Sequence, residues 1–248
     1  MSTAAMVDVN DVRKSFEDND VLKGVSFRLE KGETLVVMGG SGSGKTVLLR
    51  LIDGLIKPDS GAIRLFGQSI ERLSEEDLLP IRRRAGYVFQ NAALFDSLSV
   101  EENVGFQLRE QTSLREAEIR ERVLHFLSLV GLDEKVLAVL PAELSGGMRK
   151  RVGIARALIG QPDMLLFDEP TAGLDPTNSK MVGELISELG SEVCDTAIVV
   201  THDLELTKTV ADRVAVLIHG RFAALGRLDD VLGSRDPDVQ AFLSGEAR

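Results

Sequence analysis

Eight consecutive residues, Gly39-Gly40-Ser41-Gly42-Ser43-Gly44-Lys45-Thr46, have the types and spacing of a loop that binds phosphate groups. They fit the pattern GxxxxGK[ST] and lie between an apolar run over 34–38 and an apolar helical run over 47–56. Glycines let the backbone turn its N–H groups toward phosphate oxygens, and the N-terminus of the following helix adds its dipole. Lys45 is placed for the β- and γ-phosphates of a nucleotide, and Thr46 can ligate magnesium. A merely flexible glycine-rich loop would not need this strand–loop–helix context.

Two adjacent carboxylates, Asp168 and Glu169, follow an apolar run that begins at Met164. Adjacent strand residues point to opposite faces, but at the end of a strand the chain can turn both side chains toward one cleft. Asp168 would then hold the magnesium ion through water, and Glu169 would orient or deprotonate an attacking water. An acidic pair alone also occurs at solvated strand ends. Together with the phosphate loop, it predicts a nucleotide hydrolase.

The elements that must position these residues alternate between short strands and helices. Residues 25–29 alternate with period two, and residues 34–38 form the continuous apolar run expected of a central strand buried on both faces. Later apolar runs of the same kind cover 86–89, 164–167, 196–200 and 214–218. The pattern predicts an α/β fold in which these runs supply most of one sheet.

The middle of the chain, from Val100 to about Gly160, has little strand signal. Residues 114–130 carry apolar side chains at helical spacing, interleaved with charged ones. The apolar stripe consists of Ile119, Val123, Phe126, Leu127 and Val130. We therefore expect a helical insert attached to the sheet domain.

Composition limits the classes of function. The chain has 248 residues with 29 Lys+Arg, 39 Asp+Glu and a formal net charge of −10, so it lacks the broad basic surface that nucleic-acid phosphates require. Its single cysteine, Cys194, allows no intramolecular disulfide and indicates a reducing compartment. The N-terminal segment has no apolar signal-peptide region, and the apolar runs are too short to span a bilayer. We expect a cytoplasmic protein that binds no nucleic acid.

The segment Leu144-Ser145-Gly146-Gly147-Met148, followed by a helical run over 149–159, resembles the signature of the ATP-binding-cassette (ABC) ATPases. Physically it is a second candidate anion site, because Ser145 and two glycines open a helix with free N–H groups. In that family the signature loop meets the ATP of a second subunit. The resemblance therefore implies a head-to-tail pair of identical chains with two ATP molecules at the interface.

Other family motifs can be placed residue by residue. Gln90 resembles the glutamine that touches magnesium and water and joins the sheet domain to the helical insert. His202 matches the switch histidine that contacts the γ-phosphate, although a histidine there could also simply begin a helix. The resemblance thus implies catalytic roles for Lys45, Gln90, Glu169 and His202, and magnesium contacts for Thr46, Gln90 and Asp168.

Two further motifs concern the nucleotide base and the partner subunit. Phe16 occupies the place of the aromatic side chain that stacks on adenine, although a single Phe is also a common core residue. Gly173, Leu174 and Asp175 lie in a segment that resembles the loop through which the two subunits contact each other. The resemblance implies ATP and Mg²⁺ as cofactors, with ATP contacts from Gly39 through Val47.

The resemblance implies a P-loop (RecA-like) nucleotide-binding fold with an antiparallel β subdomain and a helical insert. We expect the ATP-binding core with the β subdomain at 1–90 and 161–235. The helical signature subdomain is expected at 91–160, and a C-terminal tail at 236–248.

The signature departs from the usual family pattern at Met148, which replaces a glutamine and cannot supply its amide hydrogen bonds. This variant, together with 89–104, 108–112 and the ending 236–245, resembles the Mla-type phospholipid-transport branch. It implies an ATPase subunit that powers phospholipid transport from the cytoplasmic face of the inner membrane. The implied partners are a second copy, transmembrane permease subunits, a lipid-binding substrate protein and a small accessory subunit.

Two surfaces are expected to contact other subunits. In the family, a coupling helix of the membrane subunit docks on the region 92–107. The side chains that could form this apolar surface, or could simply be core, are Ala93, Leu94, Phe95 and Leu98. The tail at 236–248 is expected to dock on a neighbouring subunit, because Phe242 and Leu243 form an apolar pair within a charged segment.

Two alternative functions remain open at this point. One is the ATPase subunit of an importer for amino acids or another polar solute, with the same chemistry and a different membrane subunit. The other is a non-transport ABC ATPase acting on DNA or ribosomes. Those families insert coiled coils or zinc modules or carry two cassettes, whereas about a hundred residues separate Lys45 from Ser145 here. We interpret the basic run Arg82-Arg83-Arg84 as a solvated helix face or subunit contact.

Overall fold

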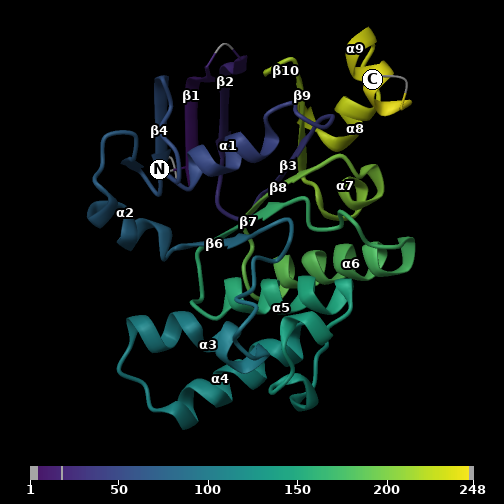
Figure 1. Ribbon diagram of the computed structural model, residues 1–248. Helices are drawn as coiled ribbons and strands as arrows, with labels where there is room; N and C mark the ends of the chain where they lie inside the picture. The colour runs from purple at the N-terminus through teal and green to yellow at the C-terminus, as the bar shows by residue number, and fades with distance from the viewer. Residues whose placement is uncertain (1–4, 18, 246–248) are drawn as a thin grey trace.

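The computed structural model describes residues 5–17 and 19–245, and their strands form two sheets (Figure 1). The larger sheet has six strands in the order β10-β9-β3-β8-β7-β6. All neighbours in it are parallel except β9 and β10. The strands are β3 (Thr34–Met38), β6 (Ala85–Val88), β7 (Met164–Asp168), β8 (Ala197–Thr201), β9 (Arg213–Ile218) and β10 (Arg221–Arg227). Five of them coincide with apolar runs expected to be strands, so the predicted α/β fold is confirmed.

The smaller sheet is antiparallel, with the order β2-β1-β4-β5. Its strands are β1 (Val7–Phe16), β2 (Asn19–Leu29), β4 (Ser60–Leu65) and β5 (Gln68–Ser69). Residues 25–29 form the end of β2, and therefore belong to this sheet rather than to the larger one. The antiparallel β subdomain implied by the family resemblance is present.

Helices fill the remaining connections. The middle of the chain contains α3 (Val100–Gln111), α4 (Glu116–Leu129), α5 (Gly146–Leu158) and two short 3₁₀ turns, η1 (Glu134–Val136) and η2 (Pro141–Glu143). The expected helical insert is therefore seen, while the domain boundaries themselves stay a prediction. The other helices are α1 (Lys45–Ile52), α2 (Glu75–Arg82), α6 (Pro176–Glu192), α7 (Leu204–Val210), α8 (Leu228–Leu232) and α9 (Pro237–Leu243).

The larger sheet is buried on both faces, because successive side chains along each strand point to opposite sides. Val36 and Met38 of β3 pack in an apolar cluster with α3, α4, α5 and α6, while Leu35 and Val37 pack in a second cluster with α1, α2 and the smaller sheet. Figure 1 shows α5 and α6 on one side of this sheet and α1 on the other.

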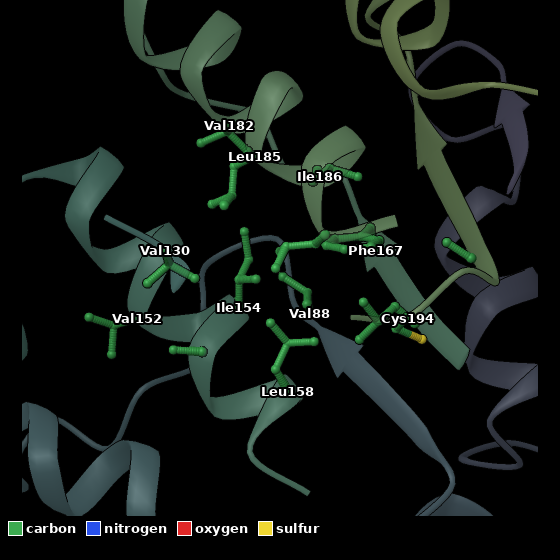
Figure 2. Packing of buried hydrophobic residues seen from close by; sticks show 14 of the residues in the cluster. Val88, Val130, Val152, Ile154, Leu158, Phe167, Val182, Leu185, Ile186 and Cys194 are labelled. Atoms are coloured by element: carbon green, nitrogen blue, oxygen red, sulfur yellow. The ribbon is translucent and has the colours of Figure 1, made fainter. Parts of the chain in front are cut away.

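The first of these clusters joins the helical segment to the sheet. Figure 2 shows Ile154 and Leu158 of α5 beside Val88 of β6 and Phe167 of β7. All four side chains are at most 1% exposed. The helix that follows the signature segment is thus anchored directly on the strand that ends in the acidic pair.

The tail differs from what its composition suggested. Val239 of α9 is fully buried, and Phe242 and Leu243 pack against the same apolar cluster as the sheet. The apolar pair that motivated docking on a neighbouring subunit is therefore used within its own chain, at least in part. The last three residues of that expectation, 246–248, lie outside the described residues.

None of the helices in 5–17 and 19–245 is both long and apolar enough to cross a membrane.

Candidate active site

The loop between β3 and α1 has the shape that its sequence predicts. Gly44, the residue before α1, has a left-handed backbone with φ 104°, and a Cβ there would lie 2.9 Å from the Leu22 side chain. At Gly39 a Cβ would lie 2.5 Å from Oγ of Ser43 and 2.7 Å from the carbonyl oxygen of Leu217. Both positions therefore require glycine.

The side of this loop that must accept a ligand is open. A Cβ placed at Gly40 or Gly42 would meet no atom within 4 Å. The buried hydroxyl of Ser43 has no hydrogen-bond partner among the atoms that the structure describes. An unpartnered donor beside a helix N-terminus fits a phosphate oxygen. The loop from Gly39 to Thr46 therefore fits the phosphates of a nucleotide.

Lys45 lies folded over its own loop. Its Nζ atom donates to the carbonyl oxygens of Gly39, at 2.8 Å, and Gly40, at 3.0 Å. The same atom forms an ion pair with Oε1 of Glu169 at 3.1 Å, and the two side chains are only 7% and 9% exposed. The phosphate loop and the end of β7 are thus joined through one buried cation.

The two residues expected at the magnesium site are in contact. Oγ1 of Thr46 donates to Oδ1 of Asp168 at 2.8 Å. The hydroxyl of Tyr87, on β6, donates to Oδ2 at 3.3 Å. Burial raises the pKa of the Asp168 carboxyl above its ordinary value, and burial together with that carboxylate raises the pKa of the Tyr87 hydroxyl. A divalent cation would stabilise the ionised form of this buried carboxylate.

Glu169 faces the same cleft as Asp168 because the backbone turns at the end of the strand. Glu169 has a left-handed conformation, with φ 47°, which is uncommon for a residue with a side chain. Its Oε2 lies 2.9 Å from Nδ1 of His202, which follows β8 and is 63% exposed in its side chain. Lys45 and His202 therefore each hold one oxygen of the Glu169 carboxylate.

Gln90 enters this network through its backbone. Its carbonyl accepts a hydrogen bond from Nζ of Lys150, on α5, and the same ammonium group donates to the carbonyl of Glu169 at 3.2 Å. The Gln90 side chain is exposed at the end of the segment that follows β6. The structure thus brings the backbone of Gln90 toward Glu169, while its side-chain amide forms no hydrogen bond with Thr46 or Asp168.

The signature segment begins α5 and lies against α6 of its own chain. Oγ of Ser145 caps the helix by accepting from the backbone N–H of Met148 at 3.2 Å. A Cβ on Gly147 would lie 2.7 Å from Oδ1 of Asn178, and one on Gly146 would lie 3.4 Å from the Leu174 side chain. The thioether of Met148 packs against the apolar core.

The remaining predicted contacts lie at the surface. Asp175 caps α6 by accepting from the backbone N–H groups of Thr177 and Asn178, and Gly173, two residues earlier, is exposed with φ 77°. Phe16 ends β1 and is 45% exposed, so it is not a core residue. The Nζ atom of Lys14 lies 5.3 Å from the centre of its ring.

A groove of about 410 Å³ lies between α2 and the helical segment. Its lining includes Leu79, Arg83, Phe89, Phe95, Phe106 and Arg156. Of the expected docking residues, Ala93 and Phe95 are exposed and line the groove, whereas Leu94 and Leu98 are half-buried.

The walls of this groove are held by specific contacts. The Phe95 and Phe106 rings pack with centroids 4.8 Å apart. Arg156 donates at 2.7 Å to the carbonyls of Ala92 and Ala93, two consecutive residues with left-handed backbones. The groove therefore has an apolar floor and a fixed loop beside Gln90.

The three arginines of the basic run, residues 82–84, have different contacts. Arg82 donates to the carbonyls of Asp53 and Gly54, at the end of α1. Arg84 pairs with Asp163 at 2.6 Å. Two of the three arginines thus have internal partners rather than forming one solvated face, while Arg83 lines the groove.

Sequence reasoning missed two residues of the site. Tyr87 looked like an ordinary strand residue, yet it contacts Asp168 and also lines the groove. Lys150 had a usable signal: it lies at i, i+4, i+8 spacing with Ile154 and Leu158, so it falls on the buried stripe of α5. A lysine on such a stripe needs hydrogen-bond acceptors.

A mostly parallel sheet carrying a phosphate loop after one strand and an acidic pair after another, with a threonine–aspartate contact between them, defines a P-loop nucleotide-binding protein. Comparison with known proteins places it more narrowly. The family model described as ABC transporter matches residues 22–172. The chain therefore belongs to the ABC transporter family, and it carries the ATP-binding domain of that family of ATPases, which bind ATP with Mg²⁺.

Curated relatives have different transport names. The chain is 39% identical to the "Probable ribonucleotide transport ATP-binding protein mkl" of Mycobacterium bovis over 96% of its length and 66% of that protein. It is 40% identical to the "Methionine import ATP-binding protein MetN" of Mesorhizobium japonicum over 96% of its length and 65% of that protein. The chain thus spans about two thirds of the length of these relatives.

Solved structures share the fold. The dimeric ATP-binding cassette MJ0796, in a post-hydrolysis state bound to ADP and Pi, is 33% identical with a TM-score of 0.84, over 90% of this chain and 99% of that one. The cbiO1 protein of Clostridium perfringens, part of the cbiONQ transporter complex, is 32% identical with a TM-score of 0.83, over 96% and 95%. The expected ABC ATPase fold is confirmed.

Proposed function

We propose that this chain is the ATP-hydrolysing subunit of an ABC transporter that moves phospholipid between membranes from the cytoplasmic face of the inner membrane. The observation that supports the hydrolytic role is that each carboxylate oxygen of Glu169 has its own side-chain partner. One carboxylate oxygen faces the lysine of the phosphate loop and the other faces His202. A carboxylate fixed at this position can accept a proton from a water that attacks the γ-phosphate.

The other residues of the site bind and orient. Loop amides from Gly39 to Val47, together with Lys45, hold the phosphates of ATP. Thr46 and Asp168, with Gln90, would hold Mg²⁺, which neutralises charge on the β- and γ-phosphates when it is bound. His202 orients Glu169 and the γ-phosphate. Phe16 has an exposed ring available to stack on adenine.

The working unit in this proposal is a head-to-tail dimer. Ser145, Gly146, Gly147 and Met148 begin a helix whose N–H groups would face the ATP of the partner chain. Gly173, Leu174 and Asp175 would form the contact between the two chains. The dimeric form of the similar cassette MJ0796 supports this arrangement.

The groove beside Gln90 is the proposed docking site for a transmembrane permease subunit. Its exposed aromatic rings, Phe95 and Phe106, and its arginines, Arg83 and Arg156, suit a short amphipathic helix with acidic side chains. A displacement at the groove would reach Gln90, because Arg156 holds the carbonyls of Ala92 and Ala93, which follow Gln90 closely in the chain. A lipid-binding substrate protein and a small accessory subunit are proposed as further partners.

The proposed cargo is phospholipid. Phospholipid is supported by the resemblance to the Mla-type branch, of which Met148 is the clearest mark. The second candidate is import of an amino acid or another polar solute, which the name of the MetN relative favours. The two candidates differ in their membrane partners rather than in the ATP site.

One experiment tests both levels. The chain is isolated with its partners from native membranes in mild detergent, its ATPase activity is measured, and its subunits and bound lipid are identified by mass spectrometry. Copurified phospholipid with an Mla-like lipid-binding subunit would support the proposal. A periplasmic receptor for a polar solute would overturn the cargo assignment, and a complex without ATPase activity would overturn the hydrolytic role.

A further inference from the structure

Lys150 is a buried lysine that none of the nucleotide-binding motifs accounts for. It lies on α5, one and a half turns after Ser145, and it is 6% exposed. Burying an ammonium group is costly unless hydrogen-bond acceptors replace water. The acceptors that its Nζ finds here are the backbone carbonyls of Gln90 and Glu169.

These two acceptors belong to separate parts of the site. Gln90 lies at the end of the segment that leaves β6 and enters the helical part of the chain. Glu169 lies at the end of β7, where its left-handed backbone turns its carboxylate into the cleft. One ammonium group therefore fixes the distance between α5, the Gln90 segment and the strained residue that bears the candidate general base.

The positive charge of Lys150 also interacts with the carboxylates of the site. Burial lowers the pKa of its ammonium group, and the carboxylates of Glu169 and Asp168 oppose that shift. The side chain of Glu169 is held from one side by Lys45, while its backbone is held from the other by Lys150. A displacement of α5 would be transmitted to Glu169 through this contact.

We propose that Lys150 is a positioning residue that couples the signature helix to the hydrolytic pocket of its own chain, and so links the two ATP sites of a head-to-tail dimer. The inference rests on the proposed function. The start of α5, at Ser145, would sense the ATP bound by the partner chain. A displacement of that helix would move Lys150, five residues further on, and with it Gln90 and Glu169. These two residues act on the ATP of their own chain.

The same helix offers a matched control. Arg151 donates to the carbonyls of Val130, at 3.4 Å, and Gly131, at 3.0 Å. It is thus a basic side chain of α5 that binds two carbonyl groups, as Lys150 does, but its acceptors lie at the end of α4 and away from the ATP site. A loss of ATPase activity that comes only from loosening α5 should appear when either Lys150 or Arg151 is replaced.

The test compares Lys150→Met, which keeps an unbranched side chain one atom shorter than lysine and removes its charge, with Arg151→Met. For Lys150→Met we expect kcat to fall about tenfold while KM for ATP changes by less than about twofold, because the coupling and not the binding surface is lost. The Hill coefficient for ATP should fall toward one. Lys150→Arg, which restores a donor, should recover part of kcat, and Arg151→Met should stay within about twofold of the parent protein.

A second measurement does not depend on activity. Amide hydrogen exchange of Lys150→Met should be faster around Gln90 and Glu169 and unchanged in the smaller sheet. In Arg151→Met, exchange should be faster around Gly131 and unchanged around Gln90 and Glu169. Unchanged exchange at Gln90 and Glu169 would overturn the inference, as would equal losses of kcat in the two variants. If the parent protein has no ATPase activity, the proposed function fails, and the exchange measurement still decides whether Lys150 positions these two residues.

Discussion

The Nζ atom of Lys45 lies 3.1 Å from Oε1 of Glu169, so the lysine of the phosphate loop is paired with the candidate general base. Both side chains are almost fully buried, and such a pair interacts far more strongly than one in water. In the proposed mechanism, a phosphate group bound in the loop would share Lys45 with this carboxylate. Binding of ATP and activation of Glu169 would then be coupled through one ammonium group.

Lys45→Ala should abolish tight ATP binding or turnover. The substitution removes the cation of the loop and leaves the buried Glu169 carboxylate with His202 as its remaining side-chain partner. Breaking a buried ion pair costs about 3 kcal/mol, so the free energy of unfolding should fall as well. Fluorescent-nucleotide titration and urea denaturation measure the two effects. The control is Lys180→Ala, since Lys180 pairs at the surface with Glu184 at 3.6 Å; an equal loss there would contradict the assignment.

Glu169→Gln should preserve ATP binding, stop hydrolysis and trap a closed dimer. The amide keeps the shape of the side chain but cannot accept a proton from water, and a general base typically contributes about 10²- to 10⁴-fold to the rate. Single-turnover hydrolysis and size-exclusion chromatography with ATP measure these outcomes. Full ATPase activity in this variant would show that another group activates the water. Glu184→Gln, at an exposed position of α6, is the matched control and should behave as the parent protein.

The motifs predicted which residues of the candidate ATP site lie together, because each motif is local in the sequence. The loop after β3, the acidic end of β7 and the cap of α5 each depend on a few consecutive residues and on the element that holds them. Lys150 and Tyr87 could not be assigned in the same way, because their partners lie 19 to 81 positions away in the chain. Their roles depend on tertiary packing, which a short pattern does not encode.

The strands that sequence reasoning missed have a similar explanation. Along β1 the pairing shifts between Val9 and Val12, and Asp11 there has a left-handed backbone with φ 44°. Such an irregularity breaks the alternation of period two by which a half-buried strand is recognised. The tail shows a different limit of composition: Phe242 and Leu243 indicated a surface for a neighbouring subunit, whereas they also pack against the apolar core of their own chain. Docking of the tail on a neighbouring subunit stays a prediction.

Tyr87→Phe should weaken the response to Mg²⁺ while leaving the fold intact. The change removes the hydroxyl that donates to Oδ2 of Asp168, and the ring can still stack on Phe89 at 4.2 Å. One such hydrogen bond contributes about 1 kcal/mol, so we expect the Mg²⁺ concentration for half-maximal ATPase activity to rise about fivefold. Mn²⁺ binding followed by electron paramagnetic resonance gives a second readout. Phe89→Leu keeps the hydroxyl and should lower stability without this change; identical metal responses in the two variants would contradict the role of Tyr87.

Asp53→Asn should remove a pH dependence of stability. Asp53 caps the C-terminal end of α1 and is 6% exposed, and its Oδ1 has no hydrogen-bond partner among the described residues. Burial raises its pKa from 3.8 to about 7 against the opposing charge of Arg82. Between these two pKa values the native state holds a proton that the unfolded chain releases, so the free energy of unfolding falls as the pH rises from about 4 to about 7.

The size of this effect can be measured by urea denaturation at pH 5 and pH 8. The asparagine variant does not titrate, and it should exceed the parent protein in stability by a few kcal/mol at pH 8 and by much less at pH 5. Asp59→Asn is the contrasting variant, because hydrogen bonds from Lys14 and Ser15 lower the pKa of that exposed carboxyl. It should lose stability at pH 8 rather than gain it. Equal pH slopes for Asp53→Asn and the parent protein would show that Asp53 is ionised in the native state.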